Sequence, residues 1–314
     1  MIVTLTLNPS LDRAVEVERL ARGEVNRATP AHLDPGGKGV NVSRALLAAG
    51  VATRAVLPVG GPEGDQLVRL LTDEGVDVAA VPVAGATRSN ITLAEPDGTV
   101  TKINERGAFL AADELDTIAD AALEASRGAD WLAICGSTPP GVPDDLYARL
   151  CRRLVAAGVR VAVDTSGPAL LAAVAAGPSV VKPNRDELGE AVGSDLHSIG
   201  DAVEAAQVLR SKGAADVLVS LGADGAVLVS DAGVVSGHSE VAEPRSTVGA
   251  GDALLAGYLA AGAAGADALA EGLAWAGAAV ALPGSQMPHP SQIDRTTVRL
   301  HERTNFDRPL ISSG

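Results

Sequence analysis

The sequence predicts an α/β protein in which helices cover both faces of a mainly parallel central sheet and a second, smaller β-sheet forms a lid. Short β-rich runs alternate with helical windows along most of the 314 residues, which is the pattern of strand–helix–strand crossover units. Residues 13–34 and 88–105 depart from this rhythm, because both have a period of two and no crossover helix between their strands. Aromatic residues are only 2% of a chain that is 46% hydrophobic, so we expect a core of Ala, Val and Leu.

The elements can be assigned in chain order. The chain starts with a predicted strand at 2–7 and a second alternating stretch at 14–18, and a helical pattern follows at 39–50. Further strands are predicted at the β-rich runs 54–59, 131–136, 159–164, 179–183 and 216–222. Helices are predicted between them, at 113–126, 143–156, 168–176 and 200–212. Because helices join consecutive strands, these strands should run parallel.

The two period-two regions indicate a separate sheet. The segment SNITLAEPDGTVTKIN reads as a β-hairpin with its turn at Asp97-Gly98. We therefore expect an α/β core formed by residues 1–12, 35–87 and 106–304, a β lid formed by 13–34 and 88–105, and a loose C-terminal tail at 305–314. Exposed lid strands suggest a homodimer through lid-on-lid pairing, and a monomeric flap is the alternative.

Composition excludes several classes of partner. The net charge of −14 and the pI of about 4.7 disfavour nucleic acid and anionic membranes as partners. The start of the chain lacks a signal-peptide pattern, and no apolar run is long enough to span a bilayer. Cys135 and Cys151 are the only cysteines, so we expect a cytoplasmic protein without a disulfide framework. In so acidic a chain, each Lys or Arg inside a motif is more informative than usual.

The stretch STVGAGDALLAGYL, residues 246–259, places one acid behind bare backbone amides. Gly249 and Gly251 allow the N–H groups to face a common point, and the next helix adds the positive end of its dipole. The amides of Gly249, Ala250 and Gly251 would form an anion hole. Asp252, kept ionised by the helix dipole, would be a general base for phosphoryl transfer. On this stretch alone, a helix N-cap after a tight turn is about as good an explanation. The commoner G-x-x-x-x-G-K-[ST] and G-x-G-x-x-G loops do not occur.

A second glycine-dense motif, DPGGKGVNVSRAL at 34–46, surrounds Lys38 with glycines and leads into a helix. Together, GGKGVNVSRAL and the later TVGAGDALLAG resemble the two signatures of the ribokinase-like PfkB carbohydrate kinase family, from TLTLNPSLDR to about Gly284. The resemblance implies a three-layer sandwich with a β lid. It is closest to the branch that phosphorylates sugar phosphates.

The resemblance also implies roles for individual residues. Sugar-binding residues are then Asp12, Gly37, Lys38, Asn41 and, within GSTPPG, Ser137. Asp252 is the base and the Gly249–Gly251 amides form the anion hole. The segment KPNRDEL supplies Lys182 for a nucleotide phosphate, and Asn184 with Glu187 for Mg²⁺, through water. ATP, the implied phosphoryl donor, is then bound by Lys182, Asn184, Ser220, Gly222, Gly225, Thr247, Gly249, Gly251 and Ser285. From the residues alone, Lys182 could be an ordinary strand-end lysine, Asn184 and Glu187 a helix cap, and Ser137 part of a turn.

Three cations in the predicted lid, Arg88, Lys102 and Arg106, favour a substrate that already carries a phosphate. We favour Arg88 and Lys102 as its clamp, although charges on lid strands also discourage edge pairing. The resemblance then implies conversion of fructose 1-phosphate to fructose 1,6-bisphosphate. Alternatives are a fructose 6-phosphate or tagatose 6-phosphate kinase, a kinase of a free sugar or nucleoside, and a regulatory protein that binds sugar phosphates without catalysis. The intact Asp252 argues against the last of these. Ser89 and Ala253 depart from the family pattern, which leaves fine specificity open.

Overall fold

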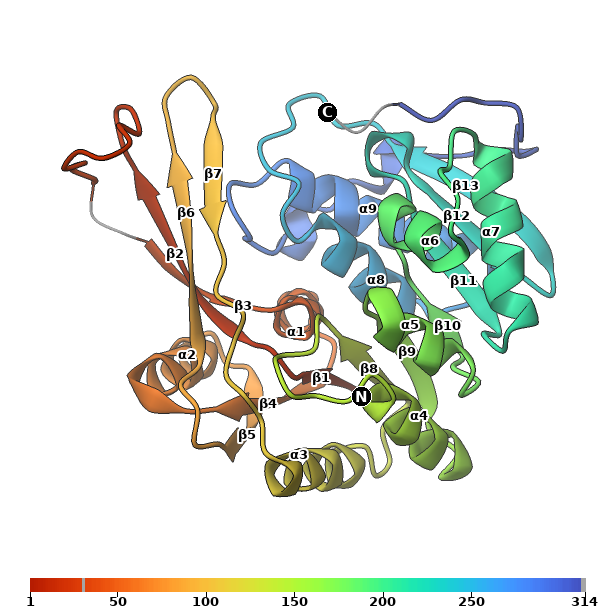
Figure 1. Cartoon of the computed structure of the whole chain (residues 1–314). Coiled ribbons are helices and arrows are strands. Elements are labelled where there is room, and N and C mark those ends of the chain that lie inside the picture. The colour runs from red at the N-terminus through yellow and green to blue at the C-terminus, as the bar shows by residue number, and fades with distance from the viewer. Residues whose placement is uncertain (30–31, 312–314) are drawn as a thin grey trace.

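The computed structural model describes residues 1–29 and 32–311 (Figure 1). Its main sheet has ten strands in the order β14-β13-β12-β11-β10-β9-β8-β1-β4-β5. The bounds of these strands are β1 (Ile2–Thr6), β4 (Thr53–Val59), β5 (Asp77–Pro82), β8 (Trp131–Cys135), β9 (Arg160–Asp164), β10 (Val180–Val181), β11 (Asp216–Ser220), β12 (Ala226–Ser230), β13 (Gly233–Ser239) and β14 (Val298–Leu300). In this order, all neighbouring strands from β11 to β5 pair in parallel. Strands β12, β13 and β14 are added antiparallel at the edge next to β11. The predicted fold class is confirmed.

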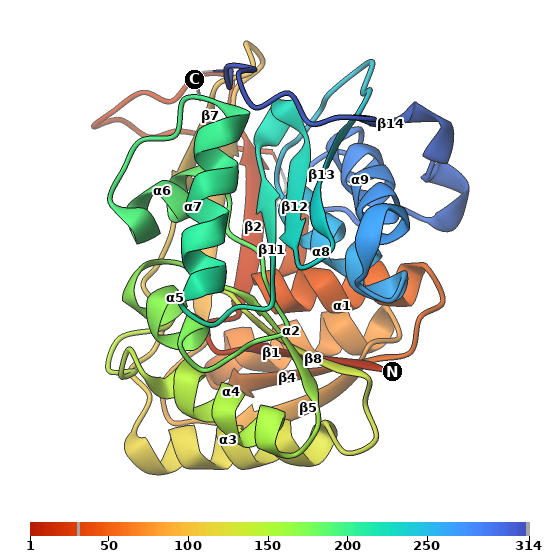
Figure 2. The same ribbon diagram turned by 90° about the vertical axis from the view of Figure 1, so that its right-hand side faces the viewer.

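Helices cover both faces of this sheet, as Figure 2 shows edge-on. Their bounds are α1 (Lys38–Ala48), α2 (Gly61–Asp73), α3 (Ala112–Ala125), α4 (Leu146–Ala156), α5 (Gly167–Val174), α6 (Arg185–Val192), α7 (Ile199–Ser211), α8 (Ala250–Ala260) and α9 (Gly265–Val280), with 3₁₀ turns η1 (Gly222–Asp224), η2 (Pro290–Gln292) and η3 (Arg295–Thr297). One buried cluster packs α3 to α7 on the sheet, and another packs α1, α8 and α9 on its opposite face. Both consist almost entirely of Ala, Val, Leu and Ile, as the composition predicts.

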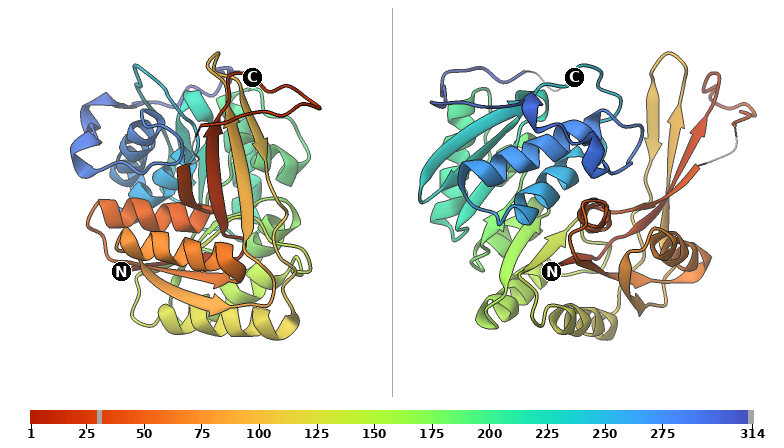
Figure 3. Two further views of the ribbon diagram at one scale, coloured as in Figure 1. Left: turned by 90° about the vertical axis from the view of Figure 1, so that its left-hand side faces the viewer. Right: turned by 180° about the vertical axis from the view of Figure 1, so that it is seen from behind.

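A second sheet, in the order β3-β2-β6-β7, stands beside the main body (Figures 1 and 3). Its strands are β2 (Ser10–Glu16), β3 (His32–Gly36), β6 (Arg88–Ala94) and β7 (Val100–Ile103). β6 and β7 form the predicted hairpin around Asp97-Gly98. The pairing begins earlier than the predicted lid boundaries, because Ser10 already pairs with Gly36 and with Arg88. Residues 30 and 31 of the predicted lid lie outside the described residues.

The expectation of a loose tail is wrong for residues 305–311. The backbone of this segment bonds to the start of α7, where the Ile199 and Gly200 amides donate to the carbonyls of Arg308 and Phe306. Leu310 is buried against the core. The tail is short and has no periodic pattern, so its order comes from these tertiary contacts, which the sequence does not reveal. Residues 312–314 lie outside the described residues.

Sequence patterns also missed several elements. The helix α2, the helix α6 and the antiparallel strands β12 to β14 are absent from the predicted series. Both α2 and α6 follow glycine- or proline-containing segments that read as turns. Among the described residues, no helix has the length and apolarity needed to cross a membrane.

Candidate active site

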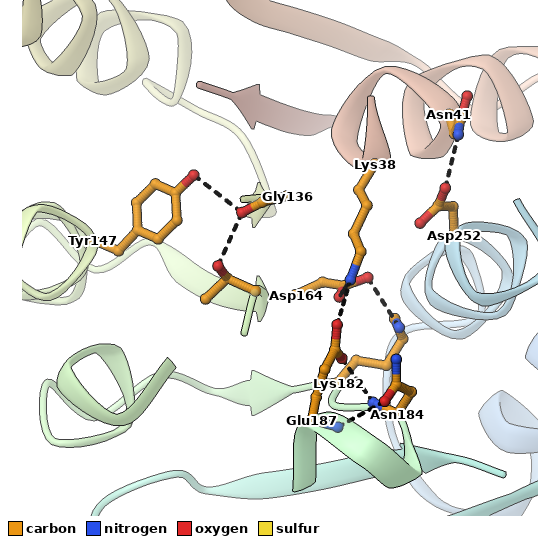
Figure 4. A network of polar contacts seen from close by, with 10 residues as sticks. Lys38, Asn41, Gly136, Tyr147, Asp164, Lys182, Asn184, Glu187 and Asp252 are labelled. Carbon is orange, nitrogen blue, oxygen red and sulfur yellow. Dashed lines mark hydrogen bonds and ion pairs between the residues drawn. The ribbon is translucent and has the colours of Figure 1, made fainter. Parts of the chain in front are cut away.

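Polar side chains gather where the carboxyl ends of the central parallel strands meet the starts of α1, α6 and α8 (Figure 4). Asp164 is the last residue of β9, and Lys182 follows β10. Lys38 is the first residue of α1, and Asp252 lies in the first turn of α8. In open α/β sheets this edge is where ligands bind, because helix N-termini converge there.

Asp252 is 7% exposed, and one of its oxygens, Oδ2, accepts a hydrogen bond of 2.8 Å from Asn41 Nδ2 on α1. Burial, together with the nearby charge of Asp164, raises the pKa of Asp252 to about 6, against the opposing effects of Asn41 and the two lysines. The sequence argument considered the helix dipole, which favours the charged form, whereas burial and Asp164 favour the neutral form. A carboxylate with this pKa is mostly ionised at neutral pH and can accept a proton efficiently.

The amides at the start of α8 differ in one detail from the predicted anion hole. Gly249 precedes the helix with a φ of 79°, a left-handed conformation that costs other residues about 1–2 kcal/mol. Among the described residues, the amides of Gly249 and Gly251 have no hydrogen-bond acceptor, whereas the Ala250 amide donates to the Thr247 carbonyl at 3.4 Å. A Cβ built on Gly251 would lie 3.4 Å from Lys182 Nζ. The Lys182 ammonium thus lies beside a residue whose amide has no acceptor among the described residues.

A buried ion-pair network joins the two lysines. Lys38 Nζ lies 2.8 Å from Asp164 Oδ1, and Lys182 Nζ lies 2.9 Å from Asp164 Oδ2. Asp164 is fully buried and Lys182 is 3% exposed. Burial by itself raises the pKa of Asp164, but Lys182 and Lys38 outweigh it and hold that pKa below its usual range. For Lys38, burial opposes the charged form, yet Asp164 and Glu187 raise its pKa. Both lysines therefore pair with the same buried carboxylate.

Asp164 is a site residue that sequence reasoning missed. The signal was present, since an acid ends the predicted strand 159–164 at the carboxyl edge of a parallel sheet. Asn8 was missed in the same way. It is buried, its Nδ2 donates to Ser137 Oγ at 3.2 Å, and its carbonyl accepts from Arg88 Nη2 at 3.0 Å.

Asn184 and Glu187 form the capping box of α6. The Glu187 amide donates to Asn184 Oδ1 at 2.8 Å, and the Asn184 amide donates to Glu187 Oε2 at 2.9 Å. The other Glu187 oxygen, Oε1, lies 3.0 Å from Lys38 Nζ. The capping explanation therefore applies in this structure, and a role near Mg²⁺ stays a prediction. In residues 1–29 and 32–311, no group of three or more His, Cys, Asp or Glu side chains could hold a metal ion.

The small sheet contributes Asp12 and Arg88. Asp12 Oδ1 accepts from Ser10 Oγ at 2.7 Å and from Asn90 Nδ2 at 2.9 Å. Arg88 donates to the carbonyls of Asn8 and Glu105, while its buried Nε has no acceptor among the described residues. Burial lowers the pKa of Arg88, although Asp12 and Glu105 oppose this shift.

Lys102 lies farther along the lid than Arg88, and their shared role as a phosphate clamp stays a prediction. It is exposed and pairs across the hairpin with Thr92, four residues along β6 from Arg88. At roughly 3.3 Å per residue, the two positions are about 13 Å apart along the strand. Of these two cations, Arg88 is the one that has a buried donor and that bonds to Asn8.

The remaining predicted nucleotide residues lie on three separate segments of the chain. Ser220 ends β11, where its amide donates to the Pro183 carbonyl. Gly222 is the first residue of the turn η1, and Gly225 follows this turn. Ser285 is buried, and its carbonyl accepts from Arg44 Nη1 at 3.3 Å. Thr247 is exposed, three residues before the start of α8. Gly37 caps α1, which places Lys38 and Asn41 on its first turn.

Comparison with known proteins agrees with this geometry. The model of the pfkB family of carbohydrate kinases matches residues 5–292. The chain is 39% identical over 268 residues to 1-phosphofructokinase of Rhodobacter capsulatus, covering 85% of each chain. It is 39% identical over 257 residues to ATP-dependent 6-phosphofructokinase isozyme 2 of Escherichia coli, covering 81% of this chain and 83% of that one. The solved structure of Escherichia coli phosphofructokinase-2 in complex with potassium is similar with a TM-score of 0.88 at 36% identity, covering 93% and 96% of the two chains. The chain belongs to the pfkB family of carbohydrate kinases.

Proposed function

We propose that this protein is a sugar-phosphate kinase that transfers a phosphoryl group from ATP to fructose 1-phosphate. The observation that carries the proposal is the buried Asp252 carboxylate at the start of α8, next to the Gly249 and Gly251 amides, which have no acceptor in residues 1–29 and 32–311. A base and an anion site at one point are what transfer to a hydroxyl group requires. The relatives named 1-phosphofructokinase support the choice of substrate.

The chemical step can be assigned to residues of this chain. Asp252 takes the proton of the acceptor hydroxyl as that oxygen forms a bond to the γ-phosphorus. The bond from this phosphorus to the β–γ bridging oxygen breaks, and ADP leaves with the electron pair. The Gly249 and Gly251 amides donate to the oxygens on which negative charge grows. Asn41 holds the carboxylate in position through its 2.8 Å hydrogen bond.

The nucleotide end of the site fits polyphosphate. Lys182 is a buried cation next to Gly251, and Lys38 lies on the other side of Asp164. ATP supplies the phosphoryl group, and Mg²⁺ would neutralise charge on its phosphates. Because both carboxylate oxygens of Glu187 are already bonded, we expect the protein to hold Mg²⁺ mainly through water. Ser220, Gly222, Gly225, Thr247 and Ser285 are proposed to surround the nucleoside.

The acceptor end fits a phosphorylated sugar. Asp12, oriented by Ser10 and Asn90, is a suitable acceptor for sugar hydroxyls. Arg88 has a buried donor without an acceptor among the described residues, and an unsatisfied donor of this kind favours an anion. We propose that Arg88 binds the phosphate that the sugar already carries.

The direct test is ADP release by the purified protein with fructose 1-phosphate, fructose 6-phosphate, tagatose 6-phosphate and adenosine in parallel. We expect the highest kcat/KM with fructose 1-phosphate. A preference for fructose 6-phosphate, supported by the relative named 6-phosphofructokinase isozyme 2, would change the substrate but keep the site assignment. Turnover with adenosine alone would overturn the phosphosugar proposal.

Replacing Arg88 tests the acceptor end. In Arg88→Ala, we expect KM for the sugar phosphate to rise by roughly 10- to 150-fold, the effect of losing a hydrogen bond between charged groups. KM for ATP should change little. Arg13→Ala, which removes an exposed arginine from the same sheet, is the matched control and should behave like the wild type. An Arg88→Ala enzyme with normal KM would point to an unphosphorylated substrate.

We also propose that the small sheet forms a homodimer contact. Val100 and Ile103 on the edge strand β7 are each 53% exposed, and exposed apolar edge strands favour pairing with another chain. Sedimentation should show a dimer that Val100→Lys with Ile103→Lys converts to a monomer. A wild-type monomer at micromolar concentration would contradict this.

A further inference from the structure

The C-terminal segment 305–311 contacts the η1 turn and the start of α6, which border the proposed nucleotide site. Its outer surface is exposed, but Leu310 packs into the core and its backbone bonds to the start of α7. This anchorage leaves the polar groups of Arg308 and Ile311 facing the η1 turn. The segment is thus held firmly enough to constrain what it touches.

Asp224 is the contact point on the nucleotide loop. It is 5% exposed, and it lies between Gly222 and Gly225. Arg308 Nη2 donates to the Asp224 carbonyl at 2.9 Å, and Arg308 Nη1 lies 3.5 Å from Asp224 Oδ1. The Ile311 amide donates to Asp224 Oδ2 at 2.8 Å. The carboxylate and the backbone carbonyl of Asp224 are therefore both held by residues of the C-terminal segment.

The backbone conformation of the 220–225 loop is also restricted by its contact with β13. Gly225 has a φ of 90°, and a Cβ built there would lie 2.0 Å from the Gly237 carbonyl oxygen on β13. The turn thus packs directly against β13 at Gly225. Another contact with the rest of the protein runs through Asp224 and the C-terminal segment. A second contact reaches α6, where Arg185 donates from Nη1 to the Ile311 carbonyl at 2.8 Å. Arg185 directly follows Asn184, the N-cap of α6.

We propose that residues 305–311 act as a clamp that positions the nucleotide loop, with Arg308 and Asp224 as positioning residues for ATP. This rests on the proposed function, because it takes the 220–225 loop to bind the nucleotide. Neither residue touches the reacting atoms. The clamp acts by holding the loop in the conformation that binds ATP, so its loss should reduce ATP affinity and leave the chemical step alone.

The test is steady-state kinetics of the full-length chain carrying Arg308→Ala or Asp224→Asn. We expect KM for ATP to rise by roughly tenfold, as for the loss of one hydrogen bond to a charged group. The value of kcat and KM for the sugar phosphate should stay within about twofold. Arg308→Lys should recover part of the ATP affinity, since it keeps the charge but loses the bidentate geometry. Asp224→Asn is nearly isosteric and serves where Arg308→Ala folds poorly.

Arg303→Ala is the matched control, because Arg303 is an exposed arginine of the same terminal region with no acidic partner among the described residues. It should leave KM for ATP unchanged. Unchanged KM for ATP in both clamp variants, or a parallel loss of kcat and of affinity for both substrates, would overturn the clamp while leaving the kinase proposal intact. A wild-type protein that neither binds an ATP analogue in calorimetry nor releases ADP would overturn the proposed function itself, and the clamp with it.

Discussion

In Asp252→Asn, kcat should fall by at least about 10²-fold, the lower end of what a general base contributes. The amide keeps the shape of the side chain and its contact with Asn41, but it cannot accept the proton of the acceptor hydroxyl. Calorimetric affinities for the sugar phosphate and for an ATP analogue should stay near those of the wild type. Asp113→Asn, which changes an exposed acid in the first turn of α3, should leave kcat unchanged.

The pH profile checks the same assignment. Because Asp252 must be ionised to act as a base and its pKa is raised to about 6, kcat/KM should be constant above this pH. Below about pH 6, kcat/KM should fall about tenfold per pH unit as the Asp252 carboxylate is protonated. This parameter is the one to follow because it reports ionisations of the free enzyme. The hydrogen bond from Asn41 lowers the pKa of Asp252, so Asn41→Ala should move this limb to higher pH. A flat profile through pH 5, or near-normal turnover in Asp252→Asn, would remove Asp252 as the base.

The second large effect is on stability. In Asp164→Asn, the free energy of unfolding without ligands should fall by roughly 3–5 kcal/mol, as when one partner of a buried ion pair is removed. Lys38 can still pair with Glu187, but the 3% exposed Lys182 would lose its carboxylate partner. Denaturant titration measures the change. Asp77→Asn, which breaks an exposed pair with Arg54, is the matched control and should cost about 1 kcal/mol or less.

A double variant separates charge from packing. Asp164→Asn with Lys182→Met removes both charges from the buried pair and should recover most of the lost stability, because no uncompensated charge remains. It should not recover turnover, since Lys182 lies beside the anion site. An Asp164→Asn protein as stable as the wild type, or a double variant no more stable than the single one, would contradict the description of this network.

Local patterns were sufficient for the fold class and for part of the site. The strand and helix periods depend on nearby residues, and the two glycine-rich segments each carry their own signature. Asp252 could be singled out because glycines and a helix start adjoin it in the sequence. Its pKa could not, because burial and Asp164 determine it, and these arise from the packing of distant segments.

The contacts that sequence reasoning missed are long-range. Asn41 and Asp252 are 211 positions apart, and Lys38 and Asp164 are 126 apart. These pairs depend on which strands are neighbours in the sheet, and that order does not follow the chain. The separation of Lys102 from Arg88 likewise depends on the register between β6 and β7. The docking of the tail on Asp224 has no local pattern at all.

The most direct test is a crystal structure of the protein with fructose 1-phosphate and a non-hydrolysable ATP analogue. The acceptor hydroxyl should lie within roughly 2.6–3.2 Å of an Asp252 carboxylate oxygen, and the γ-phosphate should accept hydrogen bonds from the Gly249 and Gly251 amides. Arg88 should contact the phosphate of the sugar. A γ-phosphate bound away from the start of α8, or an Asp252 carboxylate turned away from the acceptor hydroxyl, would contradict the assignment.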